Sequence, residues 1–249
     1  MKFIGIDLGW TSGASGLCCL NYESNQHLSL LDLDRKQPTI DILNWIDDWT
    51  SSNQPALIAV DAPTLIPNDT GMRLPDKLTH KHFHRYHAGC YPANLKRPFA
   101  QRTIEFGLSL EAKGFTHAPT LTPKTLGRYQ IEVFPHPAIV NLFNLDRILK
   151  YKKGKLCDRQ TELLKLHQLI LEILPTLEPK LDCSQTLKPI PPSQLTGIAL
   201  KTLEDQLDSL ICAYVAAYWW YWGLERNWVL GDATTGYIVV PAPNGGSGE

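Results

Sequence analysis

Two short apolar segments of this sequence each end at an aspartate. Residues 2–8 (KFIGIDL) are rich in β-branched side chains and carry Asp7 near their end, and residues 56–61 (ALIAVD) are apolar up to Asp61. Uninterrupted apolar runs of this length are typical of strands buried on both faces of a sheet. Other elements must therefore cover both faces. We expect a layered α/β structure in which two carboxylates stand at the ends of central strands.

Similar patterns predict the remaining elements. Residues 16–22 and 28–33 are short apolar runs that form an antiparallel meander with 2–8, and 129–134 predicts a fifth strand that carries Glu132. Helical spacing or boundary residues predict the helices, which are expected at 40–51, 99–113, 137–145, 158–173 and 201–222. A late strand at 237–240 is expected to close the fold.

This order of elements predicts a mixed, five-stranded sheet, with three antiparallel strands followed by parallel ones and helices on both faces. Residues 1–242 are interpreted as a single domain. Within it, 62–128 is expected to be a basic insertion of loops and helix, because repeated prolines exclude a long regular element from 62–98. The glycine-rich end, 243–249, is expected to be a flexible tail.

Acidic residues are expected to meet at one edge of this sheet. Ligand sites of open α/β sheets lie outside the carboxyl ends of strands, where Asp7 and Asp61 are placed. The helix at 201–222 contributes Asp205 and Asp208, which share one face because they are three residues apart. Glu204 and Glu132 are further candidates. The alternative is that Asp61 is a turn residue and that the helical acids belong to a solvated helix face.

Carboxylates that converge in this way are typical ligands of hard divalent cations. Mg²⁺ and Mn²⁺ prefer carboxylate oxygens, and such ions stabilise the attacking and leaving oxygens of a phosphodiester displacement. Without a cation the carboxylates would repel one another and raise one another's pKa. We therefore predict Asp7, Asp61, Asp205 and Asp208 as catalytic and metal-binding residues.

Basic residues gather in two segments, although the net charge of −1 excludes a general polybasic coat. The segment 73–102 holds the residues that we predict to contact nucleic-acid phosphates: Arg73, Arg85, Lys96, Arg97 and Arg102. A second cluster comprises Arg147, Lys150, Lys152, Lys153 and Lys155. Solvated loops are the alternative interpretation of both segments.

Other features of the composition favour a soluble, cytoplasmic protein. The most apolar stretch, 210–224, has 15 residues, whereas a membrane-spanning helix needs about 20. Six scattered cysteines without a C-x-x-C pair predict reduced thiols. The aromatic residues 219–222 cannot all face one way on a helix, so some of them must contact another helix or the partner in a homodimer.

Several motifs resemble those of a known family. They are GIDLGW (5–10), VDAP (60–63), NDTGMR (68–73), GCYPANL (89–95), EVFPHPA (132–138) and EDQLDSLICAY (204–214). Their order resembles the family called domain of unknown function 429, described as predicted ribonuclease-H-like nucleases. Asp205-x-x-Asp208-Ser-Leu is also similar to the closing D-x-x-D-A motif of the Holliday-junction resolvases, with Ser209 where alanine is usual. The resemblance implies a ribonuclease-H-like fold and a metal-dependent nuclease that acts on DNA or RNA.

Two other function classes remain open. D-L-G-W-T (7–11) resembles the first phosphate motif of ATP-dependent phosphotransferases of the actin and sugar-kinase type. Those enzymes use a second Asp-Gly phosphate turn and a mid-chain glycine pair, which this sequence lacks. The other class is a non-catalytic module that binds nucleic acid or protein on the same fold.

Overall fold

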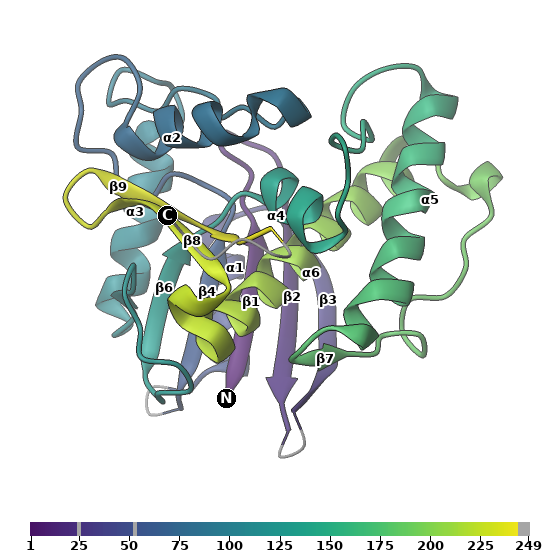
Figure 1. Ribbon diagram of the computed structural model, residues 1–249, viewed down its shortest axis with the longest axis horizontal. Helices are drawn as coiled ribbons and strands as arrows, with labels where there is room; N and C mark the ends of the chain where they lie inside the picture. The colour runs from purple at the N-terminus through teal and green to yellow at the C-terminus, as the bar shows by residue number, and fades with distance from the viewer. Residues whose placement is uncertain (24–25, 52–53, 244–249) are drawn as a thin grey trace.

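The sheet at the centre of the protein is mixed, with antiparallel strands followed by parallel ones. A computed structural model describes residues 1–23, 26–51 and 54–243. In these residues β1 (Lys2–Asp7), β2 (Ser15–Tyr22) and β3 (His27–Lys36) form the antiparallel meander, and β4 (Ala56–Val60) and β6 (Arg128–Glu132) run parallel to β1. The order is β5-β6-β4-β1-β2-β3-β7. The predicted mixed sheet is therefore confirmed, and Figure 1 shows it at the centre of the molecule.

The edges of the sheet differ from the prediction. Two-residue strands, β5 (Thr116–His117) and β7 (Lys180–Leu181), extend it at either side. The late strand predicted at 237–240 is β9 (Gly236–Pro241), but it does not close the main sheet. It forms a hairpin with β8 (Asn227–Asp232), and it contacts the main sheet through the bridge between Val133 and Val239 and through the hydroxyl of Tyr237, which donates to the carbonyl oxygen of Gln130. Its apolar residues are buried against the insertion and α4 (Pro135–Leu142), so hydrophobicity alone did not reveal its partner.

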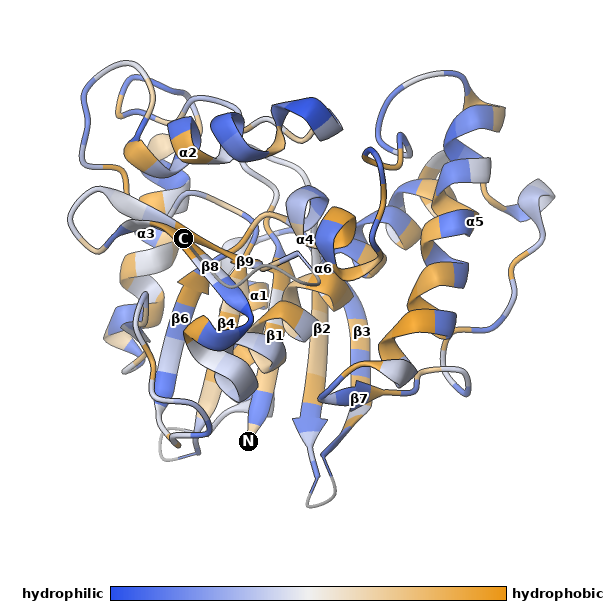
Figure 2. Cartoon of the chain, in the orientation of Figure 1, coloured by the Kyte–Doolittle hydropathy of each residue, from blue (hydrophilic) through white to orange (hydrophobic). Residues whose placement is uncertain are grey.

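Helices cover both faces, as predicted. One face carries α1 (Thr39–Trp49) and α3 (Ala100–Ala112), and the other carries α4, α5 (Leu156–Ile173) and α6 (Gly197–Trp222). Short 3₁₀ turns lie at His84–Tyr86, Leu174–Thr176, Pro192–Gln194 and Gly223–Glu225. Figure 2 shows the hydrophobic residues concentrated on the central strands and on α6. No helix in the described residues is long and apolar enough to cross a membrane.

The insertion contains a helix that the prolines seemed to exclude. The segment 62–98 includes α2 (Leu74–Phe83), which lies above the carboxyl ends of the strands (Figure 1). Pro75 lies in its first turn, where a helix needs no backbone N–H donor, so this proline starts the helix instead of breaking it. The expectation of no long regular element in this segment was therefore wrong. Residues 244–249 of the predicted tail lie outside the described residues.

The aromatic residues 219–222 are covered mainly by the chain itself. Trp219 and Trp220 donate hydrogen bonds to the carbonyl oxygens of Ala118 and Thr125, and the ring of Trp220 packs against Phe3. Trp219, Trp220 and Tyr221 are buried. Contacts with neighbouring elements therefore explain this cluster, and the homodimer stays a prediction without a test.

Alternation along the strands determines which side chains meet α6. The side chains that face α6 come from alternate positions of the two central strands: Phe3 and Gly5 of β1, and Leu57 and Ala59 of β4. The positions between and after them face α1 and α3: Ile4, Ile6, Ile58 and Val60. The same alternation places Asp7 and Asp61 on the α6 face.

The backbone of α6 lies directly on the sheet because glycines leave room for it. A Cβ atom on Gly5 would overlap the carbonyl oxygen of Ser209 and the backbone nitrogen of Ala213. A Cβ atom on Gly16 would overlap the carbonyl oxygen of Asp205. These two glycines let the acidic turn of α6 approach the ends of β1 and β2.

We predict that Gly5→Ala destabilises the fold by about 3 kcal/mol, the upper end of the usual cost of overpacking, because the new methyl group meets helix backbone. Urea unfolding measures this loss. Gly13→Ala is the matched control, since a Cβ atom there has nothing within 4 Å, and its effect should stay within about 1 kcal/mol. Equal stabilities of the two variants would contradict the close approach of α6.

Candidate active site

The end of β1 and the residue after β4 bring Asp7 and Asp61 side by side. Ile6 pairs with Val60 in the parallel ladder, and the N–H of Asp61 donates to the carbonyl oxygen of Ile6 at 2.8 Å. Asp61 is 9% exposed and Asp7 is half-buried. No described residue donates a hydrogen bond to either carboxylate or forms an ion pair with it. Two carboxylates therefore stand next to each other without a partner from the protein.

The acids of α6 are all buried, but each already contacts a cation. Asp208 Oδ1 accepts a hydrogen bond from the hydroxyl of Tyr151 at 2.6 Å. Lys152 Nζ lies 2.7 Å from Asp208 Oδ2, although that oxygen accepts no hydrogen bond from any described residue. Asp205 forms ion pairs with Arg35 at 2.8 Å and with Lys201 at 2.7 Å.

Glu204 faces a different set of neighbours. Its carboxylate pairs with Lys201 at 2.8 Å and with Arg159 of α5 at 3.4 Å. The predicted candidate Glu204 therefore supports the junction of α6 with α5, rather than joining the unpaired acids.

Four of the predicted acids share one electrostatic environment. Burial raises the pKa of Asp7 well above its ordinary value; Asp208, Asp61 and Asp205 raise it further, and Lys152 opposes the change. Burial likewise raises the pKa of Asp61 to about 7, against the effect of Lys152 and with that of Asp208. Asp205 and Asp208 therefore lie near Asp7 and Asp61, whereas Glu204 does not join them.

The structure does not contain a ready-made metal cage. Within the described residues, no three His, Cys, Asp or Glu side chains are placed to hold a metal ion. The ammonium group of Lys152 is the cation beside Asp208 instead. The donor set nevertheless fits a hard divalent cation, because it offers only carboxylate oxygens and because Asp7, Asp61 and Asp208 Oδ2 lack hydrogen-bond donors.

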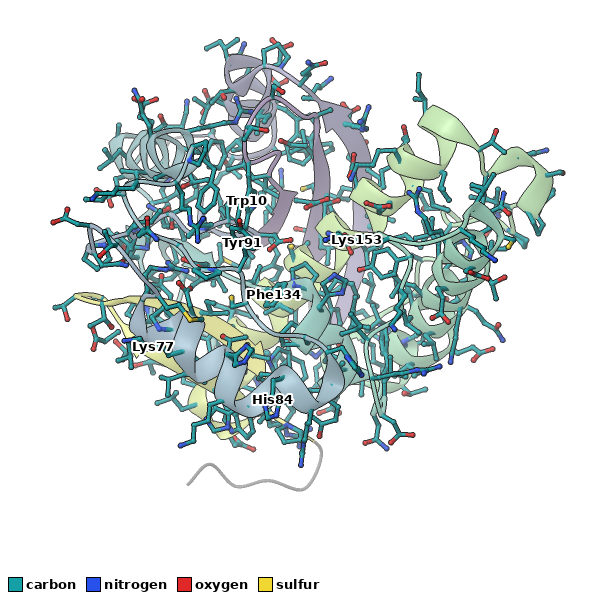
Figure 3. The ribbon with its side chains drawn as sticks, turned by 90° about the horizontal axis from the view of Figure 1, so that it is seen from above. Trp10, Lys77, His84, Tyr91, Phe134 and Lys153 are labelled. Carbon is teal, nitrogen blue, oxygen red and sulfur yellow. The ribbon has the colours of Figure 1, made fainter. Side chains whose placement is uncertain are left out.

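Asp7, Asp61 and Asp205 line a cleft of about 680 Å³ at the carboxyl ends of the strands, whereas Asp208 is fully buried and does not line it. Its other walls carry Lys150, Lys152, Lys153 and Lys201, together with His136 and the aromatic residues Trp10, Tyr91 and Phe134. Figure 3 looks down on this region, with Trp10, Tyr91 and Phe134 lying together and Lys153 across from them. Burial lowers the pKa of His136 to about 4, so its imidazole is neutral at pH 7.

Glu132 does not join the acid cluster. It pairs with Val60 in the ladder, one position before Asp61, so alternation turns its side chain toward the insertion. There both carboxylate oxygens accept hydrogen bonds from Arg73, at 2.6 and 2.8 Å. A one-residue offset in strand register thus separates Glu132 from Asp7 and Asp61.

The prediction that Arg73 contacts nucleic acid was wrong. Arg73 is 3% exposed and also pairs with Asp76 at 2.8 Å. Asp76 in turn accepts hydrogen bonds from the backbone N–H groups of Arg73 and Ala93. This buried network of Arg73, Asp76 and Glu132 fastens the insertion to β6, which is a structural role.

The other predicted basic residues lie nearer the surface. Lys96 and Arg85 are exposed, with the Arg85 guanidinium over the ring of Tyr86. Arg97 is half-buried over Tyr91, and Arg102 donates to the carbonyl oxygen of Gly9 at 2.8 Å. Arg102 thereby supports the turn after β1.

Sequence reasoning missed the particular roles of several residues around the acids. Lys152 belonged to a basic cluster that was assigned only to phosphate contacts, yet it meets Asp208. Tyr151, Arg35 and Lys201 were not predicted at all. Tyr151 lies within the second basic cluster, between Lys150 and Lys152, and is fully buried, but no spacing in the sequence links these positions to α6.

The sequence of this chain matches a known protein family. Residues 5–231 match the family described as a protein of unknown function, DUF429. The chain belongs to this family. The match spans all the predicted acids and both basic clusters, and it confirms the resemblance noted in the motifs.

Solved structures with a similar arrangement include two resolvases. A Fowlpox virus resolvase, solved with Holliday-junction DNA, is 14% identical, and the match covers 86% of this chain and 95% of that one with a TM-score of 0.37. Thermus thermophilus RuvC is 13% identical, with 87% and 98% covered and a TM-score of 0.37. No curated protein matches the sequence. The fold assignment rests on the strand order itself.

The raised pKa of Asp61 predicts a pH-dependent stability. Its ordinary value is 3.8 and its folded value is about 7, so between about pH 4 and pH 7 the folded state binds more protons than the unfolded state. The contribution of Asp61 to stability therefore falls as the pH rises through this window. In EDTA, Asp61→Asn should lose less stability than the wild type between pH 5 and pH 8, as measured by urea unfolding. Asp69→Asn, at an exposed position, should follow the wild type; parallel curves for all three proteins would contradict the prediction.

A second prediction concerns the buried network. Arg73→Ala leaves Asp76 and Glu132 buried without their cation, so we expect a loss of about 3–5 kcal/mol in the free energy of unfolding. Arg85→Ala, at an exposed arginine of the same insertion, should change it by about 0.5 kcal/mol or less. Chemical denaturation distinguishes the two, and a small effect of Arg73→Ala would place this arginine at the surface after all.

Proposed function

We propose that this protein is a nuclease that hydrolyses phosphodiester bonds of nucleic acid with Mg²⁺ or Mn²⁺. The observation that carries the proposal is the meeting of Asp7 and Asp61, both unpaired and lining an open cleft that also presents lysines, with the buried carboxylate of Asp208. Buried, unpaired carboxylates cost stability. Their presence at the carboxyl ends of the central strands is explained by a bound cation.

Asp7, Asp61 and Asp208 would hold the metal, with Asp205 beside them. A bound divalent ion supplies stabilisation of developing negative charge and lowers the pKa of water. The hydroxyl of Tyr151 holds Asp208 by one oxygen and leaves Oδ2 directed toward Lys152. Arg35 and Lys201 each engage one oxygen of Asp205, so both oxygens of that carboxylate are paired.

The remaining polar groups of the cleft suit a phosphate backbone. Lys150 and Lys153 are exposed and offer ammonium groups to phosphates. Lys152 contacts Asp208, and it would be available to pair with a substrate phosphate if that carboxylate held a cation. The neutral imidazole of His136 is available as a hydrogen-bond acceptor.

A calorimetric titration with Mn²⁺ is the first test. The wild type should bind the ion, and Asp7→Asn should bind it at least about tenfold more weakly, because it removes one of three anionic ligands. Asp69→Asn is the control, because it removes one negative charge at an exposed position outside the site. Identical, negligible binding by wild type and Asp7→Asn, also with nucleic acid present, would refute the metal site.

Cleavage assays complete the test. The wild type with Mn²⁺ should cut at least one of branched DNA, single strands or RNA–DNA hybrids, and Asp208→Asn should lose this activity. Binding of these nucleic acids without any cleavage would leave the non-catalytic module as the better description.

A further inference from the structure

A smaller pocket opens from the side of the cleft next to Asp61. Its volume is about 290 Å³, at the lower end of the usual range of about 300–1,000 Å³ for small-molecule sites. Five residues line both the pocket and the cleft: Trp10, Asp61, Tyr91, Phe134 and Lys153. Whatever enters the pocket therefore remains connected to the acids and lysines of the cleft.

Aromatic rings from three separate elements form its walls. Trp10 follows β1 and is held by Phe99, with ring centroids 4.5 Å apart, and by a hydrogen bond of 2.9 Å to the carbonyl oxygen of Asp61. Phe134 lies between β6 and α4, and Tyr91 comes from the insertion. Figure 3 shows these three rings together over the centre of the molecule.

Tyr91 is not needed for the core. It is 59% exposed, and the guanidinium of Arg97 lies 5.0 Å from its ring centroid. A large ring in contact with water beside two other rings provides a stacking surface for a flat heterocycle.

At the polar end of the pocket, Arg73 has no free N–H group to donate to a ligand, whereas Glu132 can still accept a hydrogen bond. All five N–H groups of Arg73 are used, by Asp76, Glu132 and the carbonyl oxygen of Leu65. Glu132 accepts two of these bonds, whereas a carboxylate can accept about four, so acceptor capacity remains. The remaining acceptor position favours a ring that carries an amino group.

We propose that this pocket binds a single unstacked nucleobase with an exocyclic amino group, such as adenine or cytosine, while its sugar and phosphate lie in the cleft. The inference rests on the proposed nuclease function and specifies its substrate: a strand with an unpaired nucleotide at the site of cleavage. The volume accommodates one heterocycle and excludes a base pair. Lys153 at the mouth pairs with the adjoining phosphate, and Asp61 marks the side where the acids lie.

Fluorescence anisotropy with DNA duplexes in EDTA tests the pocket without cleavage. A duplex with one bulged adenine should bind more tightly than the same duplex with a bulged thymine, and both more tightly than the perfect duplex. Tyr91→Ala should weaken binding of the bulged adenine by roughly 5- to 150-fold, the range for loss of one base–aromatic stack. Tyr91→Phe should retain it, because the ring remains.

Tyr86→Ala is the matched control. Tyr86 is also a tyrosine of the insertion with an arginine over its ring, but it does not line the pocket. Equal affinities of wild type and Tyr91→Ala, equal losses in Tyr91→Ala and Tyr86→Ala, or equal affinity for bulged and perfect duplexes would overturn the proposal.

The two proposals fail in distinguishable ways. If the wild type and Tyr91→Ala cut nucleic acid with Mn²⁺ equally well, the nuclease stands and the base pocket falls. If Tyr91-dependent binding of the bulged adenine occurs without any cleavage, the pocket stands and the nuclease falls. Absence of both binding and cleavage removes both.

Discussion

The contact between the backbone of α6 and the glycines of β1 and β2 is the constraint on which the rest of the structure depends. Gly5 and Gly16 have no side chain, so Ser209 and Asp205 lie directly on the strands. This contact carries the acidic turn of α6 to the end of the sheet where Asp7 and Asp61 stand. A larger residue at either glycine would lift the helix and separate the two halves of the site. The small side chain of Ser209 is compatible with the same approach.

The site contains more carboxylates than the neighbouring lysine and arginine side chains neutralise. Lys152 compensates Asp208, and Arg35 and Lys201 compensate Asp205, but Asp7 and Asp61 have no cation of their own among the described residues. Burial and mutual repulsion then favour protonation, which is the cause of their raised pKa values. This arrangement is unfavourable for stability, and a cation bound as proposed would relieve it.

The insertion contributes to the site through a different kind of interaction. Arg73 joins Asp76 and Glu132 in a buried network that holds α2 and the following loop against β6. That loop supplies Tyr91, and β6 leads into Phe134, so the network sets two walls of the side pocket. Because all donors of Arg73 are engaged, the same network also determines that the pocket offers an acceptor to a ligand. The buried ion pairs of the insertion therefore position the exposed aromatic residues at its rim.

Sequence alone determined the elements whose signals are local. Apolar runs revealed β1 and β4 and placed an aspartate at each end, and three-residue spacing put Asp205 and Asp208 on one face of α6. Only the tertiary structure decided which charges meet. The register of β6 against β4 turns Glu132 toward Arg73, and the path of the loop before α5 brings Lys152 to Asp208. Periodicity reports which face of an element is buried, because burial repeats along a helix or a strand. Strand register and loop paths depend on contacts between distant segments, and no local pattern records them.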